Sequence, residues 1–261
     1  MGARRNEISQ GARHSMRLMI FSDIHGNLEA LQSVLDDAAG RNVHRSICLG
    51  DLVGYGPYPN ECIEIVRNIK NCRCLAGNHD VAALWETSPY GMSKAAKEAI
   101  LWTMDQLSPE NKTYLTSLPD RLDLDLMTFV HANPYNPKGW RYVMDRKYAL
   151  RSFAATRSRF IFIGHSHRPL VISKKHWLAV NIKTIRGDTQ CFVDDTKRRI
   201  VNCGSVGQPR DDDPRAGYLI YDTKKQTLYF HRVEYDVQKT AQAIRDVNLP
   251  AVLGRRIVKG I

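Results

Sequence analysis

The first half of the chain alternates short apolar runs with stretches of helical periodicity. Residues 18–21 form a continuous apolar run of strand length, and residues 28–39 place apolar side chains three and four positions apart, which predicts a helix. The succession repeats as a strand at 46–49, a helix at 61–69 and a strand at 72–76. Strands that alternate with helices in this way predict a parallel arrangement of neighbouring strands.

The rest of the chain changes character at Pro119. Residues 93–118 are predicted to be helical, with Ser108 and Pro109 beginning a second helix as its N-cap and first residue. Residues 237–247 are expected to form a closing helix, and the sequence from Pro250 onward predicts no element. The strands expected between these helical parts lie at residues 126–130, 160–163, 170–173, 177–181, 190–193, 199–202, 218–221 and 227–233.

Domain organisation and setting follow from what the sequence contains. We interpret residues 1–15 as a flexible N-terminal extension, and we expect one domain over residues 16–261, because no repeat or linker divides them. No apolar run approaches the roughly 20 residues that cross a bilayer, so no membrane partner is expected. The six cysteines show no paired framework of the secreted type, which favours a cytoplasmic protein.

Composition narrows the class of partner. Apolar residues make up 43% and charged residues 25% of the 261 residues, as in ordinary folded proteins. The net charge of +11 favours anionic partners, including phosphates. The densest basic clusters, at 197–199 and 255–256, are short and lack interleaved aromatic residues, which argues against a nucleic-acid partner. The sequence predicts no particular oligomeric state.

Polar clusters of Asp, His or Asn follow the apolar runs at five places in the chain. The carboxyl ends of strands in parallel α/β sheets are where ligands bind, so these clusters are expected to converge on one site. A lone Asp-x-His or His-x-His pair is more often a surface loop or a buried structural histidine, but five coincidences favour a metal site. Oxygen and nitrogen ligands without thiolate suit Mn²⁺, Fe, Zn²⁺, Co²⁺ or Ni²⁺.

These clusters carry a family resemblance. In order and spacing, the sequence resembles the signature of the calcineurin-like metallophosphoesterases at Asp23-Ile24-His25-Gly26-Asn27, Gly50-Asp51, Gly77-Asn78-His79-Asp80, Val130-His131-Ala132 and Gly164-His165-Ser166-His167. Residues 202–211 resemble the glycine-rich element of the small bacterial-type phosphodiesterases of that superfamily. With this element, the resemblance covers about residues 17–234.

The resemblance implies an α/β fold, a sandwich of two central mixed β-sheets flanked by helices, and two divalent metal ions, with Mn²⁺ expected first. It assigns Asp23, His25, Asp51 and His167 to one ion, and Asp51, Asn78, His131 and His165 to the other. Two ions about 3.5–4 Å apart can share a hydroxide that attacks a phosphoryl group in line. His79 is then the candidate to protonate the leaving oxygen.

One departure from the pattern bears on the substrate. The protein-phosphatase branch carries Gly-Asp-x-Val-Asp-Arg-Gly, whereas this chain has Gly54 and Tyr55 in place of the second acid and the arginine. Without a carboxylate to orient His79, substrates with good leaving groups are favoured, namely phosphodiesters and phosphoanhydrides of small nucleotides. The candidate phosphate-binding residues are Arg210, Arg168 and Gly204 with its glycine-rich neighbours, and the candidate cleft-lining aromatic residues include Tyr55 and Trp140.

Two alternatives remain open from the sequence. The same chemistry could serve a phosphomonoesterase or a protein Ser/Thr phosphatase. A function of another class would be a non-catalytic metal-binding interaction scaffold, since some members of the superfamily have kept the fold and lost ligand residues. Because every expected ligand is present here, the enzyme is the leading hypothesis.

Overall fold

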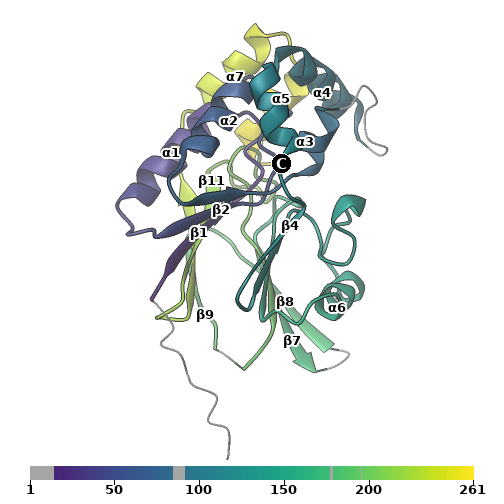
Figure 1. The fold of residues 1–261 in the computed structure, drawn as a ribbon. Helices are drawn as coiled ribbons and strands as arrows, with labels where there is room; N and C mark the ends of the chain where they lie inside the picture. Colours follow the sequence, from purple (N-terminus) through teal and green to yellow (C-terminus); the bar gives the residue numbers. More distant parts are fainter. Residues whose placement is uncertain (1–14, 85–91, 177–178, 195) are drawn as a thin grey trace, which may run out of the picture.

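Two six-stranded mixed β-sheets form the centre of the molecule (Figure 1). The computed structural model describes residues 15–84, 92–176, 179–194 and 196–261. The first sheet has the order β3 (Cys72–Cys74), β2 (Arg45–Cys48), β1 (Arg17–Phe21), β11 (Ala216–Asp222), β12 (Thr227–Val233) and β9 (Thr189–Phe192). The second has the order β4 (Arg121–Leu124), β5 (Met127–Val130), β6 (Phe160–Ile163), β10 (Arg199–Asn202), β7 (Leu170–His176) and β8 (Ala179–Thr184).

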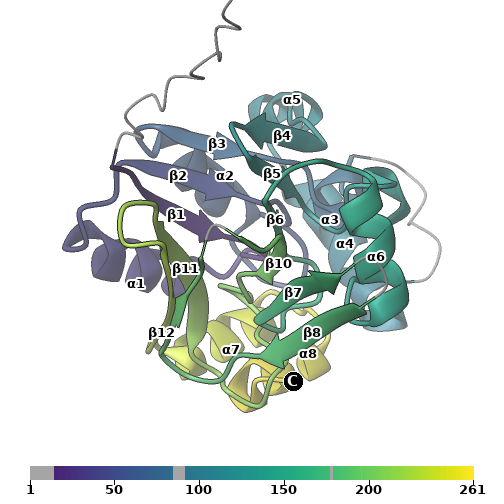
Figure 2. The same ribbon diagram turned by 90° about the horizontal axis from the view of Figure 1, so that it is seen from below.

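Helices cover the outer faces of both sheets (Figures 1 and 2). On the side of the first sheet lie α1 (Leu28–Ala39), α2 (Pro59–Asn68), α3 (Asn78–Ala82), α4 (Lys94–Gln106), α5 (Pro109–Thr116) and α7 (Val237–Asp246). The last helix, α8 (Ala251–Lys259), packs on α7, and α6 (Arg146–Ala154) packs against the second sheet. The molecule is therefore layered as helices, sheet, sheet and helix.

The alternation of side chains along the strands explains this layering. In β1, Leu18 and Ile20 point into the apolar core between the sheets, while Met19 and Phe21 point to the core beneath the helices of the first sheet. Successive side chains of a strand face opposite sides, so a run that is apolar throughout has to be covered on both faces. Phe162 of β6 belongs to the core between the sheets and is fully buried, as are Leu18 and Ile20 of β1.

The structure confirms the predicted sandwich and the parallel β1, β2 and β3. It also confirms helices within 93–118 and a closing helix near 237–247. Residues 177 and 178, where one expected strand begins, lie outside the described residues. Nearly all of the expected extension at 1–15 lies outside them as well. None of the helices within the described ranges is long and apolar enough to cross a membrane.

Several elements differ from the sequence prediction. Residues 251–259 form α8, which was not predicted. Gly254 and two adjacent arginines separate its buried residues Leu253 and Ile257 in the sequence, so no helical pattern was evident. The helix α6 and the strand β4 were also not predicted, and Asn78 begins the short helix α3 where a loop was expected. These elements are short, and packing against the rest of the molecule stabilises them more than local sequence does.

Candidate metal centre

The loops that follow β1, β2, β3, β5 and β6 meet at one end of the two sheets. Backbone hydrogen bonds join them: the Asp23 amide donates to the Gly50 carbonyl at 2.9 Å, and the Gly164 amide donates to the His131 carbonyl at 2.9 Å. The His165 amide donates to Asp23 Oδ2 at 3.0 Å, which ties the second sheet to the first. The five polar clusters therefore form one site, as predicted from their positions after strands.

The backbone turns sharply at most of the predicted ligands. Five of them have left-handed φ angles, namely Asp23 (58°), His25 (52°), Asp51 (56°), His165 (64°) and His167 (58°). Each such conformation costs about 1–3 kcal/mol for a residue other than glycine, although Asp and His adopt it more readily than most. Strain concentrated at strand ends is typical of sites whose side-chain positions serve a function.

The seven predicted ligands come together as two overlapping groups. Candidate ligand atoms lie within 4.8 Å of one another in the group of Asp23, His25, Asp51 and His167, and again in the group of Asp51, His131 and His165. Asp51 is common to both. Asn78 lies beside the second group, with its Oδ1 3.2 Å from His131 Nε2. The candidate ligands thus lie close together in two groups that share Asp51, and their binding of metal stays a prediction.

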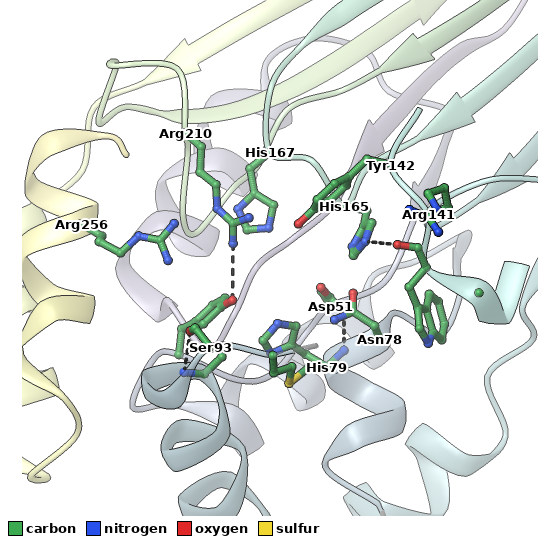
Figure 3. Close-up of a pocket in the computed structure, with 15 residues that line it drawn as sticks. Asp51, Asn78, His79, Ser93, Arg141, Tyr142, His165, His167, Arg210 and Arg256 are labelled. Atoms are coloured by element: carbon green, nitrogen blue, oxygen red, sulfur yellow. Dashed lines mark hydrogen bonds between the residues drawn. The ribbon is translucent and has the colours of Figure 1, made fainter. Parts of the chain in front are cut away.

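The ring nitrogens of the histidines have the arrangement that metal ligation requires. Nδ1 lies 3.0 Å from the Val53 carbonyl in His25 and 3.0 Å from the Leu49 carbonyl in His131, so each ring can donate there and present Nε2 to the centre. In His165 the roles are exchanged, because Nε2 lies 2.8 Å from the Trp140 carbonyl, leaving Nδ1 (Figure 3). Such hydrogen bonds fix the tautomer and orient metal-ligating histidines.

An unpartnered carboxylate oxygen also fits a cation. Asp23 is fully buried, and its Oδ1 has no hydrogen-bond partner among the described residues, although His167 Nε2 lies 3.3 Å away. A buried anionic oxygen without a partner is costly, and a cation would satisfy it. The donor set of carboxylate, imidazole and amide groups therefore fits two divalent ions.

The protonation of the histidines in this cluster depends on burial and on the charges of the Asp23 and Asp51 carboxylates. Burial lowers the pKa of His165 to about 3, and the neighbouring His131 acts in the same direction. Burial also opposes a charge on His131, but the adjacent Asp51 carboxylate outweighs it and raises the His131 pKa to about 9. A cation bound at this centre would compete with that proton, because imidazole binds metal only in its neutral form.

His79 lies beside the cluster without belonging to either group. Burial lowers its pKa to about 4, and its Nδ1 has no hydrogen-bond partner in the described part of the chain. A Cβ at Gly54 would lie 2.4 Å from this Nδ1, so the missing second acid of the family pattern falls directly against His79. The Tyr55 ring packs at 4.5 Å from the His79 ring instead. Among the described residues, no carboxylate accepts a hydrogen bond from Nδ1 of this ring.

Asp80 holds the loop that carries Asp51. Its buried carboxylate accepts hydrogen bonds from the amides of Asp51 (2.8 Å), Leu52 (2.8 Å) and Gly77 (2.9 Å). Burial, with the nearby Asp51 charge, raises the Asp80 pKa to about 7. Asp80 thereby fixes the start of α3 and the Asp51 loop relative to each other.

An open cavity of about 610 Å³ lies over the two groups. Figure 3 shows Arg210, Arg256, Arg141 and Tyr142 around it, from three separate parts of the chain. The sequence analysis identified Arg210, Tyr55 and Trp140 as candidates, and all three line the cavity. It missed three further lining residues, Arg256, Arg141 and Tyr142; for Arg256 the only signal was the basic pair at 255–256, which we interpreted as surface.

The other two predicted phosphate-binding residues do not line this cavity. Arg168 is exposed and donates from Nε to the Arg210 carbonyl at 2.7 Å. Gly204 lies in the glycine-rich segment, whose amides are already used: Gly204 donates to Asn202 Oδ1 at 2.9 Å, and Gly207 donates to the Asp23 carbonyl at 2.9 Å. This segment braces the Asp23 loop, and a contact of Gly204 with substrate stays a prediction.

Comparison with known proteins agrees with this site. Residues 16–226 match the model of the calcineurin-like phosphoesterase superfamily domain. The chain belongs to this superfamily. It is 39% identical over 247 residues to an uncharacterised protein of Methanocaldococcus jannaschii, and the match covers 93% of this chain and 98% of that protein. As a member of the superfamily with its ligand residues assembled, the protein is a metal-dependent phosphoesterase.

Solved structures support the same assignment. The crystal structure of a metallophosphoesterase from Sphaerobacter thermophilus is 40% identical, with a TM-score of 0.86, and the match covers 95% of this chain and 100% of that one. A hypothetical protein from Pyrococcus horikoshii OT3 is 20% identical, with a TM-score of 0.75 and coverage of 94% and 99%. The second likeness shows the fold alone.

Proposed function

We propose that the protein is a two-metal hydrolase that cleaves phosphodiester or phosphoanhydride bonds of small nucleotides. The observation that carries this proposal is the pair of overlapping ligand groups that share Asp51 beneath an open cavity. Asp23, His25, Asp51 and His167 would hold one ion, and Asp51, Asn78, His131 and His165 the other. When bound, two such ions lower the pKa of a water molecule and polarise a phosphoryl group.

The residues around the ligands supply positioning and charge. Arg210 donates to Tyr55 Oη at 3.4 Å and lines the cavity, so its guanidinium is available to a phosphoryl oxygen. His79 lines the same cavity, and we assign its ring the stabilisation or protonation of the leaving oxygen. Arg210 thus offers a positive charge close to Tyr55, the residue that replaces the arginine of the protein-phosphatase pattern.

The substrate class follows from what surrounds His79. An uncharged histidine without a carboxylate partner is a weak proton donor, so bonds with good leaving groups are favoured over phosphoserine esters. Trp140 and Tyr142 give the cavity two aromatic side chains on which a nucleobase can stack. Six cysteines, none paired with another, support a cytoplasmic setting, and Mn²⁺ is the ion we expect first.

The first test of the proposal is replacement of the shared ligand. Asp51→Asn should lower kcat for every hydrolysed substrate by about 10³-fold or more and reduce the bound metal below two ions per chain. The screen uses a nitrophenyl diester, a nitrophenyl monoester, a dinucleoside polyphosphate and a phosphopeptide with Mn²⁺, Zn²⁺ or Ni²⁺, and elemental analysis counts the ions. Asp36→Asn, at an exposed position of α1, is the matched control.

The outcomes separate the candidate functions. Hydrolysis of the diester or the polyphosphate by the wild type, lost in Asp51→Asn and kept in Asp36→Asn, supports the proposal. Cleavage of the phosphopeptide alone would make the protein a phosphatase and overturn the argument from Gly54. Two bound ions without any turnover would favour an interaction scaffold, and no bound ion would remove the metal mechanism.

A further inference from the structure

The C-terminal helix α8 brings a second arginine into the cavity. Arg256 reaches from α8 toward Arg210, which comes from the loop after β10, and both line the cavity above the ligand groups (Figure 3). Arg256 lies on the far side of Arg210 from His167. Residue 256 also lies beyond the stretch 16–226 that matches the superfamily domain. The contribution of α8 therefore comes from outside the matched stretch.

Neither arginine pairs with an Asp or Glu side chain in the described structure. Arg210 donates to Gln208 Oε1 from Nε (3.2 Å) and from one Nη (2.9 Å), and to Tyr55 Oη at 3.4 Å. Arg256 donates from Nε at 2.9 Å to an oxygen of Ile261, the last residue of the sequence, and its side chain also interacts with Tyr55. No ion pair of either arginine with an Asp or Glu side chain is found among the described residues. The remaining guanidinium N–H groups are thus available to a ligand in the cavity.

Two like charges placed side by side repel each other, and partial burial adds to the cost. Burial and the positive charge of Arg210 both lower the pKa of Arg256. The same Arg210 charge also lowers the pKa of His167 and His79, which places Arg210 close to the metal ligands. An anion between Arg210 and Arg256 would relieve this repulsion, and planar guanidinium groups match phosphate oxygens in geometry.

We infer that Arg256, together with Arg210, forms a subsite for a second phosphate group, adjacent to the phosphoryl group held at the metal centre. Such a subsite makes the protein selective for phosphoanhydride-linked oligophosphates, such as dinucleoside polyphosphates, over substrates with a single phosphorus. The inference rests on the proposed function and narrows its substrate class. Arg256 is in this view a specificity-determining residue, because it contacts the part of the substrate next to the reacting group.

The kinetic test compares Arg256→Gln, Arg256→Lys and the control Arg255→Gln. Arg255 is the exposed neighbour on α8 and does not line the cavity. For diadenosine tetraphosphate, Arg256→Gln should lower kcat/KM by about 10–100-fold, the effect of losing a charge-assisted hydrogen bond, and Arg256→Lys should lower it less. For bis(p-nitrophenyl) phosphate both variants should stay within about twofold of the wild type, and Arg255→Gln should match the wild type on both substrates.

A binding measurement separates this inference from the proposed function. Calorimetry on the protein as purified, without added metal, uses tripolyphosphate and inorganic phosphate as probes. Arg256→Gln should weaken tripolyphosphate binding by about tenfold or more and change phosphate binding much less. If the wild type hydrolysed nothing but this difference persisted, the proposed function would fail and the subsite would stand.

Other outcomes would overturn the subsite. Unchanged tripolyphosphate binding and unchanged selectivity in Arg256→Gln would sink it, and the proposed function would be unaffected. An equal loss on the diester and on the tetraphosphate would assign Arg256 a structural role instead. Thermal unfolding of each variant checks folding. If Arg256→Gln does not fold, Arg256→Lys decides alone, with a loss of about threefold or more confined to the tetraphosphate as the supporting result.

Discussion

At the scale of single residues, Gly54 determines how His79 is held. Its φ of +83° is left-handed, and a Cβ there would meet His79 Nδ1 at 2.4 Å. The same position in the protein-phosphatase pattern carries an acid. In this chain the histidine has no charged partner there, and the backbone of Gly54 packs closely against its ring instead. Tyr55 completes the exchange, because its ring packs against His79 and its hydroxyl accepts a hydrogen bond from Arg210.

Gly54→Ala should therefore disturb both stability and catalysis. The new methyl group meets a left-handed backbone and the His79 ring, and we expect a loss of about 2 kcal/mol in the free energy of unfolding. Displacement of His79 should also lower kcat on a nitrophenyl diester by about tenfold or more, with the metal content unchanged. Urea unfolding, steady-state kinetics and elemental analysis measure the three quantities.

The control is Gly40→Ala at the C-terminus of α1. Gly40 has a φ of −79°, and nothing lies within 4 Å of the position a Cβ would take. It should leave kcat unchanged and shift the free energy of unfolding by less than about 1 kcal/mol, in the stabilising direction. If Gly54→Ala behaved like this control, close packing at His79 would have no bearing on the reaction.

At the scale of elements, the site depends on how strand ends are tied to the segments that follow. The Asp51 loop after β2 and the beginning of α3 share one anchor, the Asp80 carboxylate, which accepts three short hydrogen bonds from backbone amides. Those amides are buried with it and have no water to replace the bonds. The position of Asp51 is thus set by a residue on a different element.

Asp80→Ala should loosen this junction. Leaving several buried amides without an acceptor should cost about 3 kcal/mol of unfolding free energy. Because the Asp51 loop would no longer be held, metal affinity should fall by about 10–100-fold, which is the usual effect of removing the support of a ligand. Calorimetric titration with metal measures the affinity, and urea unfolding measures the free energy of unfolding.

Asp36→Ala, at an exposed position of α1, removes a carboxylate without removing a backbone anchor. It should change neither metal affinity nor stability by more than about 0.5 kcal/mol. Wild-type metal affinity in Asp80→Ala would show that the loop holds its shape without the carboxylate, and the anchoring role would have to be abandoned.

At the scale of the whole molecule, acid stability depends on a histidine remote from the metal centre. His231 of β12 stacks at 4.9 Å on Tyr218 of β11, beneath α1. Burial lowers its pKa to about 4, with the positive charge of Arg41 acting in the same direction. The charged and titratable groups around it come from α1 and the turn after it, from β1, β11 and β12, and from the loop before β9. They are Asp37, Arg41, Arg17, Tyr218, Tyr229 and Asp188.

The sign of the pH effect follows from the direction of this shift. The unfolded chain takes up a proton at His231 near pH 6.5, whereas the folded chain does so only near pH 4. The folded state therefore loses stability as the pH falls from about 6.5 to about 4. Because His231 is only partly buried, we expect its share to be about 1 kcal/mol between pH 7 and pH 5.

His231→Gln should remove this contribution to the pH dependence of the unfolding free energy. The difference between the unfolding free energies at pH 7 and pH 5, measured in urea, should be about 1 kcal/mol smaller than in the wild type. His176→Gln, at an exposed position, should keep the wild-type difference. An unchanged difference in His231→Gln would mean that His231 makes no contribution to the loss of stability in acid.

The sequence by itself determined the candidate ligands and the architecture. The apolar runs and the polar residues after them were sufficient, because the ends of parallel strands meet at one edge wherever such strands form. Asp23, Asp51 and His131 therefore came together as expected, and so did the sandwich. Strand periodicity is a local property of the sequence, so the strands could be predicted without knowing the tertiary contacts.

Only the tertiary structure decided the surroundings of the ligands. Arg256 enters the cavity because α8 packs on α7, and no local pattern distinguishes it from its exposed neighbour Arg255. The glycine-rich segment was predicted to bind phosphate, yet the Gly207 amide donates its hydrogen bond to the Asp23 carbonyl. Such contacts join residues far apart in the chain, and their partners are fixed by packing. The candidate ligands could thus be predicted from the sequence, while the side chains that surround them are set by packing between distant elements.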